Sequence, residues 1–247
     1  RTTQYTNRSA EMDAIIFDVD ISITQSQSNA GSQQSRPQAW AKNIIAVGGV
    51  DHENTLSKAD DRWTGASIGP AADGRIKPDL THFYDSIDTT SCCGIASYTS
   101  SFGGTSGATP IVAGYLGLFY DMWADGIFGN EVIPGAGVFA NRSAQSTAKA
   151  FLINTAVPYD WTQGGPNGNL TRPRQGWGMP SAITMWEQRE RTLVVDEEVV
   201  LGNLQSHTEL VTVLPGEPAL RVTLTWADPP GTTSSVQHRI NDLDLVV

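Results

Sequence analysis

The pattern of apolar and polar positions changes near residue 190, which predicts two regions of different architecture. Residues 44–50 (IIAVGGV) form a continuous apolar run between polar turns, a pattern typical of a strand buried on both faces of a parallel sheet. Ile21 and Ile23 alternate with polar residues and predict a strand that runs into the polar loop SQSNAGSQ. Residues 64–78 are rich in Gly and Pro and predict a loop.

Apolar residues at helical spacing predict helices around these strands. The first covers residues 9–17, with Ser9 as its cap. A second starts at Ser106 and is apolar around most of its circumference, which is typical of a buried helix. Further helices are expected over residues 143–156 and within residues 176–186.

From residue 192 onward, apolar and polar side chains alternate strictly, which predicts half-buried antiparallel sheet. Leu220, Val222, Leu224 and Trp226 share one face, and Arg221, Thr223 and Thr225 share the other. The expected fold is therefore an α/β domain with a parallel sheet over residues 1–190, followed by an antiparallel β-sandwich that starts within residues 191–247. About 60 residues make a marginal sandwich, so this second domain is expected to be incomplete.

Composition and charge exclude two classes of partner. The 247 residues carry a net charge of −10 and their basic residues are scattered singly, so no nucleic-acid surface is expected. No apolar run reaches the roughly 18 residues that a membrane span needs. Cys92 and Cys93 are adjacent, and neighbouring Cα atoms at ~3.8 Å lie below the ~4.4 Å lower limit of ordinary disulfides, so a bond between them would be strained.

The stretch SFGGTSGATPIVAG at 101–114 holds the strongest candidate for chemistry, Ser106. A serine before a helix commonly caps it. The same position also favours a nucleophile, because free N–H groups and the helix dipole at a helix start stabilise developing negative charge. Gly104, Gly107 and Ala108 leave room for a substrate backbone beside the hydroxyl. The residues alone leave both interpretations open.

The motif GGTSGATPIVAG resembles the nucleophile motif of subtilisin-like serine proteases, Gly-Thr-Ser-x-Ala-x-Pro. SQSNAGSQ followed by AKNIIAVGGV resembles the family's Ser-Ala-Gly-Asn-x-Gly loop and the strand after it, and RIKPDL resembles its Lys-Pro-Asp element. NDLDLVV is similar to part of the jelly-roll domain carried by one branch of the family. The resemblance therefore runs along most of the chain.

This resemblance implies a secreted or extracellular endopeptidase that hydrolyses peptide or protein substrates by acyl transfer, without a cofactor for the chemistry. It implies that Ser106 is the nucleophile and that the Asn29 amide and the Ser106 backbone N–H stabilise the oxyanion. It also implies that Ser26, Gln27 and Ser28 line the pocket for the residue before the scissile bond. Without the resemblance, a loop asparagine that makes local turn bonds is the favoured interpretation of Asn29.

The chain departs from the family in its histidines. The subtilisin triad runs Asp, His, Ser, and the first two should precede Asn29 by many residues. None of His52, His82, His207 and His238 matches the base; His52 is interpreted as a surface-turn residue, and His82 lies in THFYD, where the family has Ala-Pro-Gly. We therefore expect the Asp and His to lie upstream of Arg1, and residues 1–247 to be inactive alone.

Two other classes of protein remain open on the sequence. An α/β-hydrolase esterase, with the order Ser, Asp, His, could use His207 or His238, but residues 104–108 lack the second glycine of G-x-S-x-G. A non-catalytic pseudoprotease or binding protein would keep the fold without a complete triad.

Structural calcium is a further expectation, because subtilases often carry it and oxygen ligands suit that ion. The densest group of candidate ligands is Asp228, Asn241, Asp242 and Asp244. A solvated turn between strands is the alternative, since no loop here has the spacing of a known calcium motif.

Overall fold

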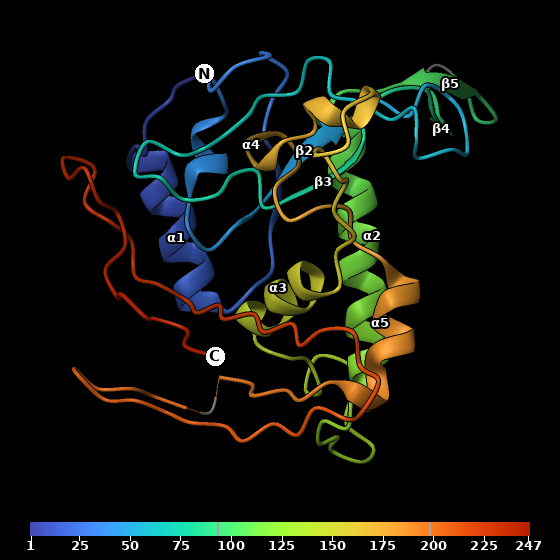
Figure 1. Ribbon diagram of the computed structural model, residues 1–247. Helices are drawn as coiled ribbons and strands as arrows, with labels where there is room; N and C mark the ends of the chain where they lie inside the picture. The colour runs from blue at the N-terminus through green and yellow to red at the C-terminus, as the bar shows by residue number, and fades with distance from the viewer. Residues whose placement is uncertain (93, 198) are drawn as a thin grey trace.

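The fold is built on a parallel sheet of three strands. The computed structural model describes residues 1–92, 94–197 and 199–247. The strands β1 (Thr24–Ser26), β2 (Ile45–Val50) and β3 (Leu80–Phe83) lie in that order, with Ser26 beside Val47 and Val47 beside Leu80. Every residue of β2 is buried, as its continuous apolar run predicts. The α/β prediction for the first region is thus confirmed (Figure 1).

The long helix α2 (Thr105–Ala124) packs across all three strands of this sheet. Val112, Leu116, Phe119 and Trp123 recur at helical spacing and are buried in the main core. The opposite face, which starts at Ser106, is exposed and consists mostly of small residues: Pro110, Ala113, Gly114, Gly117, Leu118 and Asp121. The prediction that this helix is buried on nearly all sides is therefore wrong: a methyl group on Gly114 or Gly117 would meet no described atom within 4 Å.

The remaining helices surround this core. They are α1 (Asn7–Val19), α3 (Gln145–Asn154), α4 (Arg172–Gln175), α5 (Ala182–Gln188) and the short 3₁₀ turns Pro37–Trp40, Pro166–Asn169 and Arg189–Arg191. Helix α1 starts earlier than predicted, because Thr6 and not Ser9 is its N-cap residue. The Ser9 hydroxyl accepts from the Thr6 N–H at 3.0 Å and donates to the Pro37 carbonyl at 2.6 Å. Among the described residues, no helix is long and apolar enough to cross a membrane.

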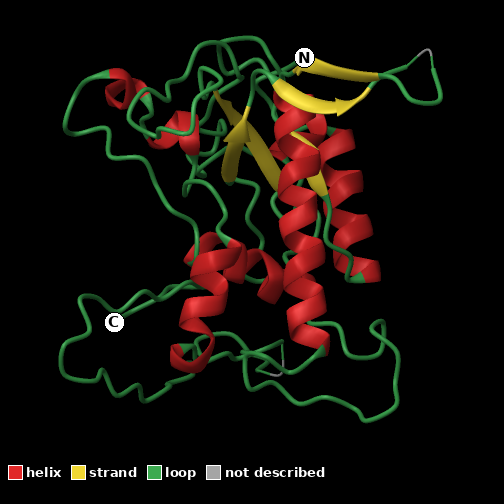
Figure 2. Cartoon of the chain, turned by 90° about the vertical axis from the view of Figure 1, so that its right-hand side faces the viewer, coloured by secondary structure: helices red, strands yellow, loops and turns green. Residues whose placement is uncertain are grey.

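A two-stranded antiparallel hairpin leads into α2. Its strands are β4 (Ile87–Thr90) and β5 (Tyr98–Phe102), and the hairpin projects from one end of the molecule (Figure 2). Its base is packed tightly, because a side chain on Gly107 would come within 2.4 Å of Ile87 Cδ1. Cys92 is exposed near the tip, and Cys93 lies outside the described residues.

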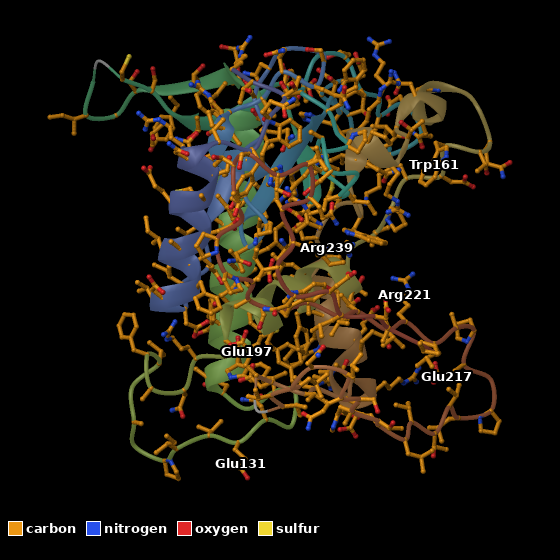
Figure 3. All side chains as sticks on the ribbon, turned by 90° about the vertical axis from the view of Figure 1, so that its left-hand side faces the viewer. Glu131, Trp161, Glu197, Glu217, Arg221 and Arg239 are labelled. Carbon is orange, nitrogen blue, oxygen red and sulfur yellow. The ribbon has the colours of Figure 1, made fainter. Side chains whose placement is uncertain are left out.

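The segment after α5 does not form the predicted β-sandwich. Between residues 192 and 247, the described residues contain no strand, and the chain runs as an extended tail (Figure 2). Figure 3 shows Glu217 on the part of the tail that projects away from the body of the molecule. Alternating side chains become half-buried only when a neighbouring strand or sheet covers one face. No such strand is present here, so Leu220, Val222 and Leu224 stay between 38% and 47% exposed.

Two parts of the tail are nevertheless fixed to the α/β domain. Near α3, Thr225 Oγ1 donates to the Ser146 carbonyl at 2.6 Å. Near α1, the buried ammonium of Lys42 and the buried carboxylate of Asp228 form an ion pair at 2.6 Å. Asn43 exchanges hydrogen bonds with the Asp228 backbone, accepting at 3.0 Å and donating at 2.8 Å. Residues around 228 are therefore joined to the α/β domain by a buried ion pair and by buried hydrogen bonds.

Candidate active site

Ser106 is the second residue of α2, and its hydroxyl does not cap the helix. The N-cap residue is Gly104, and no side chain there caps the helix start. Ser106 is exposed, and no described residue forms a hydrogen bond with its Oγ. Of the two interpretations that the sequence left open, capping by Ser106 is therefore wrong.

The side chain of Asn29 lies beside the first turn of α2. Its Oδ1 accepts from the Thr105 N–H at 3.0 Å and from Thr105 Oγ1 at 2.9 Å. These bonds orient the amide, so that Nδ2 remains as a donor without a partner among the described residues. Asn29 is exposed, so Nδ2 can donate to a bound molecule.

Gly104 allows this close approach between the Asn29 loop and α2. A Cβ at position 104 would lie 2.7 Å from Asn29 Nδ2, a separation that real Cβ atoms do not show. Its φ of +79° also lies in the region that glycine adopts far more easily than other residues. The Gly-Thr-Ser motif therefore has glycine at this position because a larger side chain would clash with Asn29.

Thr105 links the two halves of the site, a role that sequence reasoning missed. It is buried, and its Oγ1 donates to Asn29 Oδ1 while it accepts from the Ser28 N–H at 3.2 Å. Ser28 has a φ of 101°, so its backbone is held in a conformation unusual for serine. The sequence did hold a signal for this role: Thr105 directly precedes Ser106, and a threonine hydroxyl can both donate and accept hydrogen bonds.

The three residues expected to line a substrate pocket precede Asn29 directly. Ser26 is the last residue of β1 and is partly exposed. Gln27 and Ser28 are buried, and Gln27 N donates to the Val47 carbonyl at 2.9 Å. The Gln27 side-chain amide has no hydrogen-bond partner among the described residues. The structure thus brings Ser28, Asn29 and the Ser106 turn together through Thr105.

None of the four histidines forms a hydrogen bond with Ser106. His207 is exposed beside Glu209, at 2.5 Å. His238 is buried and stacks on Tyr5 with ring centroids 4.3 Å apart. Neither matches the base that the esterase alternative requires.

His52 begins a turn, as predicted, because its carbonyl accepts from the Thr55 N–H at 2.9 Å, but its side chain does not lie free on the surface. Its side chain is only 12% exposed, and its Nδ1 lies 2.7 Å from Asp85 Oδ1. Its ring stacks on Phe83 with centroids 4.4 Å apart. The spacing of 33 residues between His52 and Asp85 hides this pair from local sequence patterns.

His82 is buried in β3, and burial, with smaller contributions from Lys58 and His52, lowers its pKa to about 4. Between about pH 4 and 6.5 the unfolded chain binds a proton at this position that the folded chain does not. We expect this histidine to remove up to roughly 3 kcal/mol from the free energy of unfolding as the pH falls through that window.

Urea unfolding at pH 7 and pH 4.5 measures this effect. His82→Phe should lose less stability than the wild type on acidification, whereas the exposed control His207→Ala should behave like the wild type. An unchanged acid dependence in His82→Phe would contradict the assignment.

The Lys-Pro-Asp element holds the starts of β2 and β3 together below the site. Asp79 Oδ2 accepts from Lys77 Nζ at 2.6 Å and from the Ala46 N–H at 2.7 Å, and Lys149 Nζ lies 3.2 Å from Asp79 Oδ1. Burial disfavours the charged carboxylate, but Lys149 and Lys77 hold the pKa of Asp79 below its usual value. Burial in turn lowers the pKa of Lys77.

The residues expected to bind calcium do not form an oxygen cage. Asp228 Oδ2 accepts from Lys42 Nζ and from the Ile240 N–H, and its Oδ1 accepts from the Asn241 N–H. Asp242 pairs with Arg239 at 2.9 Å. Across residues 1–92, 94–197 and 199–247, no three His, Cys, Asp or Glu side chains come together as a metal site. This donor set therefore does not fit the ion.

The chain is thus an α/β protein in which a helix presents an exposed serine in its first turn, with an asparagine amide beside it. The sequence profile of the subtilase family matches residues 6–178, which is more than half of the chain. The chain belongs to the subtilase family, and the matched residues include all three strands of the parallel sheet.

Two curated relatives support this assignment. Over 119 residues the chain is 30% identical to serine protease AprX of Bacillus subtilis (strain 168). This aligned segment is 42% of this chain and 26% of the relative. Over 206 residues the chain is 25% identical to the serine protease/ABC transporter B family protein tagA of Dictyostelium discoideum, which covers 74% of this chain and 11% of the relative. The chain thus spans only a small part of each relative.

Among solved structures, the PatG macrocyclase in complex with peptide has a similar fold. The TM-score is 0.55 at 16% identity, with 78% of this chain and 49% of the other covered. The PatG macrocyclase domain alone gives a TM-score of 0.51 at 16% identity, with 72% and 46% covered. These likenesses concern the fold alone.

Proposed function

We propose that the protein is a serine endopeptidase in which Ser106 attacks a peptide carbonyl and forms an acyl-enzyme. One observation carries this proposal: the Asn29 amide is turned by Thr105 so that its Nδ2 donor is free beside the helix start that presents Ser106. The Asn29 Nδ2 and the Ser106 N–H would then donate to the oxyanion that forms on the substrate. Both groups are fixed before substrate binds, which is the condition for electrostatic stabilisation of a transition state.

We infer that the base which activates Ser106 comes from a part of the protein outside these 247 residues. A serine is a weak nucleophile until a base removes its proton, and no described histidine is hydrogen-bonded to Ser106. The exposed face of α2 supports this inference. That face starts at Ser106, continues with small residues on an otherwise apolar helix, and could be covered by a further segment.

Three finer features belong to the same proposal. Residues 26–28 would form one wall of the pocket for the residue before the scissile bond, because they lead directly into Asn29. The tail would belong to a jelly-roll domain whose strands pair only when further chain supplies their neighbours. Secretion is proposed from the family alone.

A fluorophosphonate probe, which reacts with an activated serine, tests the function. In the full-length protein the probe should label Ser106 rapidly, and Ser106→Ala should abolish labelling. Ser101→Ala, which removes an exposed hydroxyl in β5, should leave labelling unchanged. Residues 1–247 alone should label slowly.

Two results would each overturn one part of the proposal: the first the external base, the second the activity itself. Rapid labelling of residues 1–247 alone would show that the base lies within this chain. Absence of labelling in the folded full-length protein would favour a non-catalytic pseudoprotease.

A further inference from the structure

The pair His52–Asp85 joins the carboxyl ends of two strands of the parallel sheet. Asp85 Oδ1 accepts both from the His52 backbone N–H and from its Nδ1, each at 2.7 Å. His52 follows the end of β2, and Asp85 follows the end of β3. The Asp85 side chain is 25% exposed and the His52 side chain 12%, so water screens these bonds only in part.

The backbone around Asp85 supports the turn that presents Ser106. The Gly104 N–H donates to the Tyr84 carbonyl at 2.6 Å. A Cβ on Gly103 would lie 2.6 Å from the Tyr84 carbonyl oxygen and 3.5 Å from Asp85 Cα. The backbone of residues 103 and 104 is therefore in direct contact with the backbone of residues 84 and 85, without side chains between them.

The residues on both sides of Asp85 have a constrained backbone. Ser86 has a φ of 47°, which is rare for a residue other than glycine, asparagine or aspartate. On the other side, the Tyr84 N–H donates to the Val50 carbonyl at 2.8 Å, and the Tyr84 ring packs on Gly49 so closely that a Cβ there would lie 2.2 Å from Cδ2. The Asp85 carboxylate thus fixes, through His52, a bend that is followed directly by the left-handed residue Ser86.

We propose that His52 and Asp85 are positioning residues for the reaction at Ser106. The path runs from His52 to Asp85, through the Tyr84 carbonyl to the Gly104 N–H, and from Gly104 to Asn29 Nδ2 and Ser106. The proposal rests on the proposed function, because a position matters for rate only if Ser106 reacts. A displacement of about 1 Å in such a turn lowers a rate by as much as 10²-fold.

Two substitutions at Asp85 of the full-length protein, assayed on a peptide substrate, test this inference. Asp85→Ala removes the acceptor and should lower kcat by about 10- to 100-fold with little change in KM. Asp85→Asn keeps an oxygen that can accept both N–H groups and should restore kcat to within a few-fold of the wild type. The matched control is Asp88→Ala, an exposed carboxylate on β4, which should leave kcat unchanged.

The outcomes separate this inference from the proposed function. If fluorophosphonate does not label Ser106 in the wild type, the proposed function fails, and this inference fails with it. If the wild type is labelled, an unchanged kcat in Asp85→Ala, an effect on KM alone, or an equal loss in Asp85→Asn would each overturn the positioning role. Should Asp85→Ala not fold, His52→Ala, which removes the side-chain donor, replaces it and is expected to lower kcat at unchanged KM; an unchanged kcat would overturn the role.

Discussion

Replacing Asn29 with alanine is expected to lower kcat by about 10²- to 10³-fold in the full-length protein, the loss known for one oxyanion donor in subtilisin. The reason is that Nδ2 donates to charge that develops only in the transition state, so KM should change little. Steady-state kinetics on a peptide substrate measure both constants. Asn29→Ala also removes the acceptor of the buried Thr105 N–H and Oγ1, so the melting temperature should fall as well, and the kinetics are measured well below it.

A second substitution at this position sharpens the test. Asn29→Asp keeps an oxygen that can accept from the Thr105 N–H and Oγ1, but it replaces the donor with a negatively charged oxygen. Its kcat should therefore lie below that of Asn29→Ala. Activity in Asn29→Asp close to the wild type would contradict the oxyanion role, whatever the stability of the variants.

Asp79→Ala is expected to destabilise the fold by about 3–5 kcal/mol, the usual cost of breaking a buried ion pair from one side. Without the carboxylate, the ammonium groups of Lys77 and Lys149 lose their shared buried partner, and the Ala46 N–H loses its acceptor. Urea unfolding should show a lower midpoint with an unchanged slope. Asp121→Ala, an exposed change on α2, should leave the midpoint within error of the wild type.

The same site offers a compensating variant. Replacing Asp79 with Leu together with both lysines by Met removes the charges as a group, and such replacements are often neutral. This triple variant should recover most of the lost stability. If it is as unstable as Asp79→Ala, the loss comes from packing or from the Ala46 contact, and the explanation by uncompensated charge is wrong.

The parts of the fold that could be predicted are those in which one segment carries its own signal. The apolar run of β2 predicts a buried parallel strand because burial on both faces leaves no alternation. The hairpin β4–β5 was missed because its strands carry few apolar residues, and their position depends on the contact of Ile87 with Gly107. In the tail, alternation predicts strands that stay unconfirmed, because a strand requires a partner and the described residues supply none there.

The candidate site divides in the same way. Ser106 and Asn29 lie in motifs that local sequence identifies. The orientation of the Asn29 amide and the linking role of Thr105 depend on a contact across 76 residues, which no local pattern encodes. The pairing and burial of the His52 side chain were missed because its partner, Asp85, lies 33 residues away. Long-range polar pairs are therefore the part of this site that only the structure supplies.

The ion pair between Lys42 and Asp228 joins the α/β domain to a residue beyond the predicted end of that domain. The change in the apolar–polar pattern predicts that the α/β domain ends near residue 190. The side chains of Lys42 and Asp228 are nevertheless only 5% and 4% exposed, and the two residues are 186 positions apart in the sequence. A chain that ended near residue 190 would leave the Lys42 ammonium without the Asp228 carboxylate. It would also expose the aromatic ring of Tyr5, on which His238 stacks. Residues around 228 and 238 thus supply contacts that keep Lys42 paired and Tyr5 buried, although they lie far beyond the change in sequence pattern.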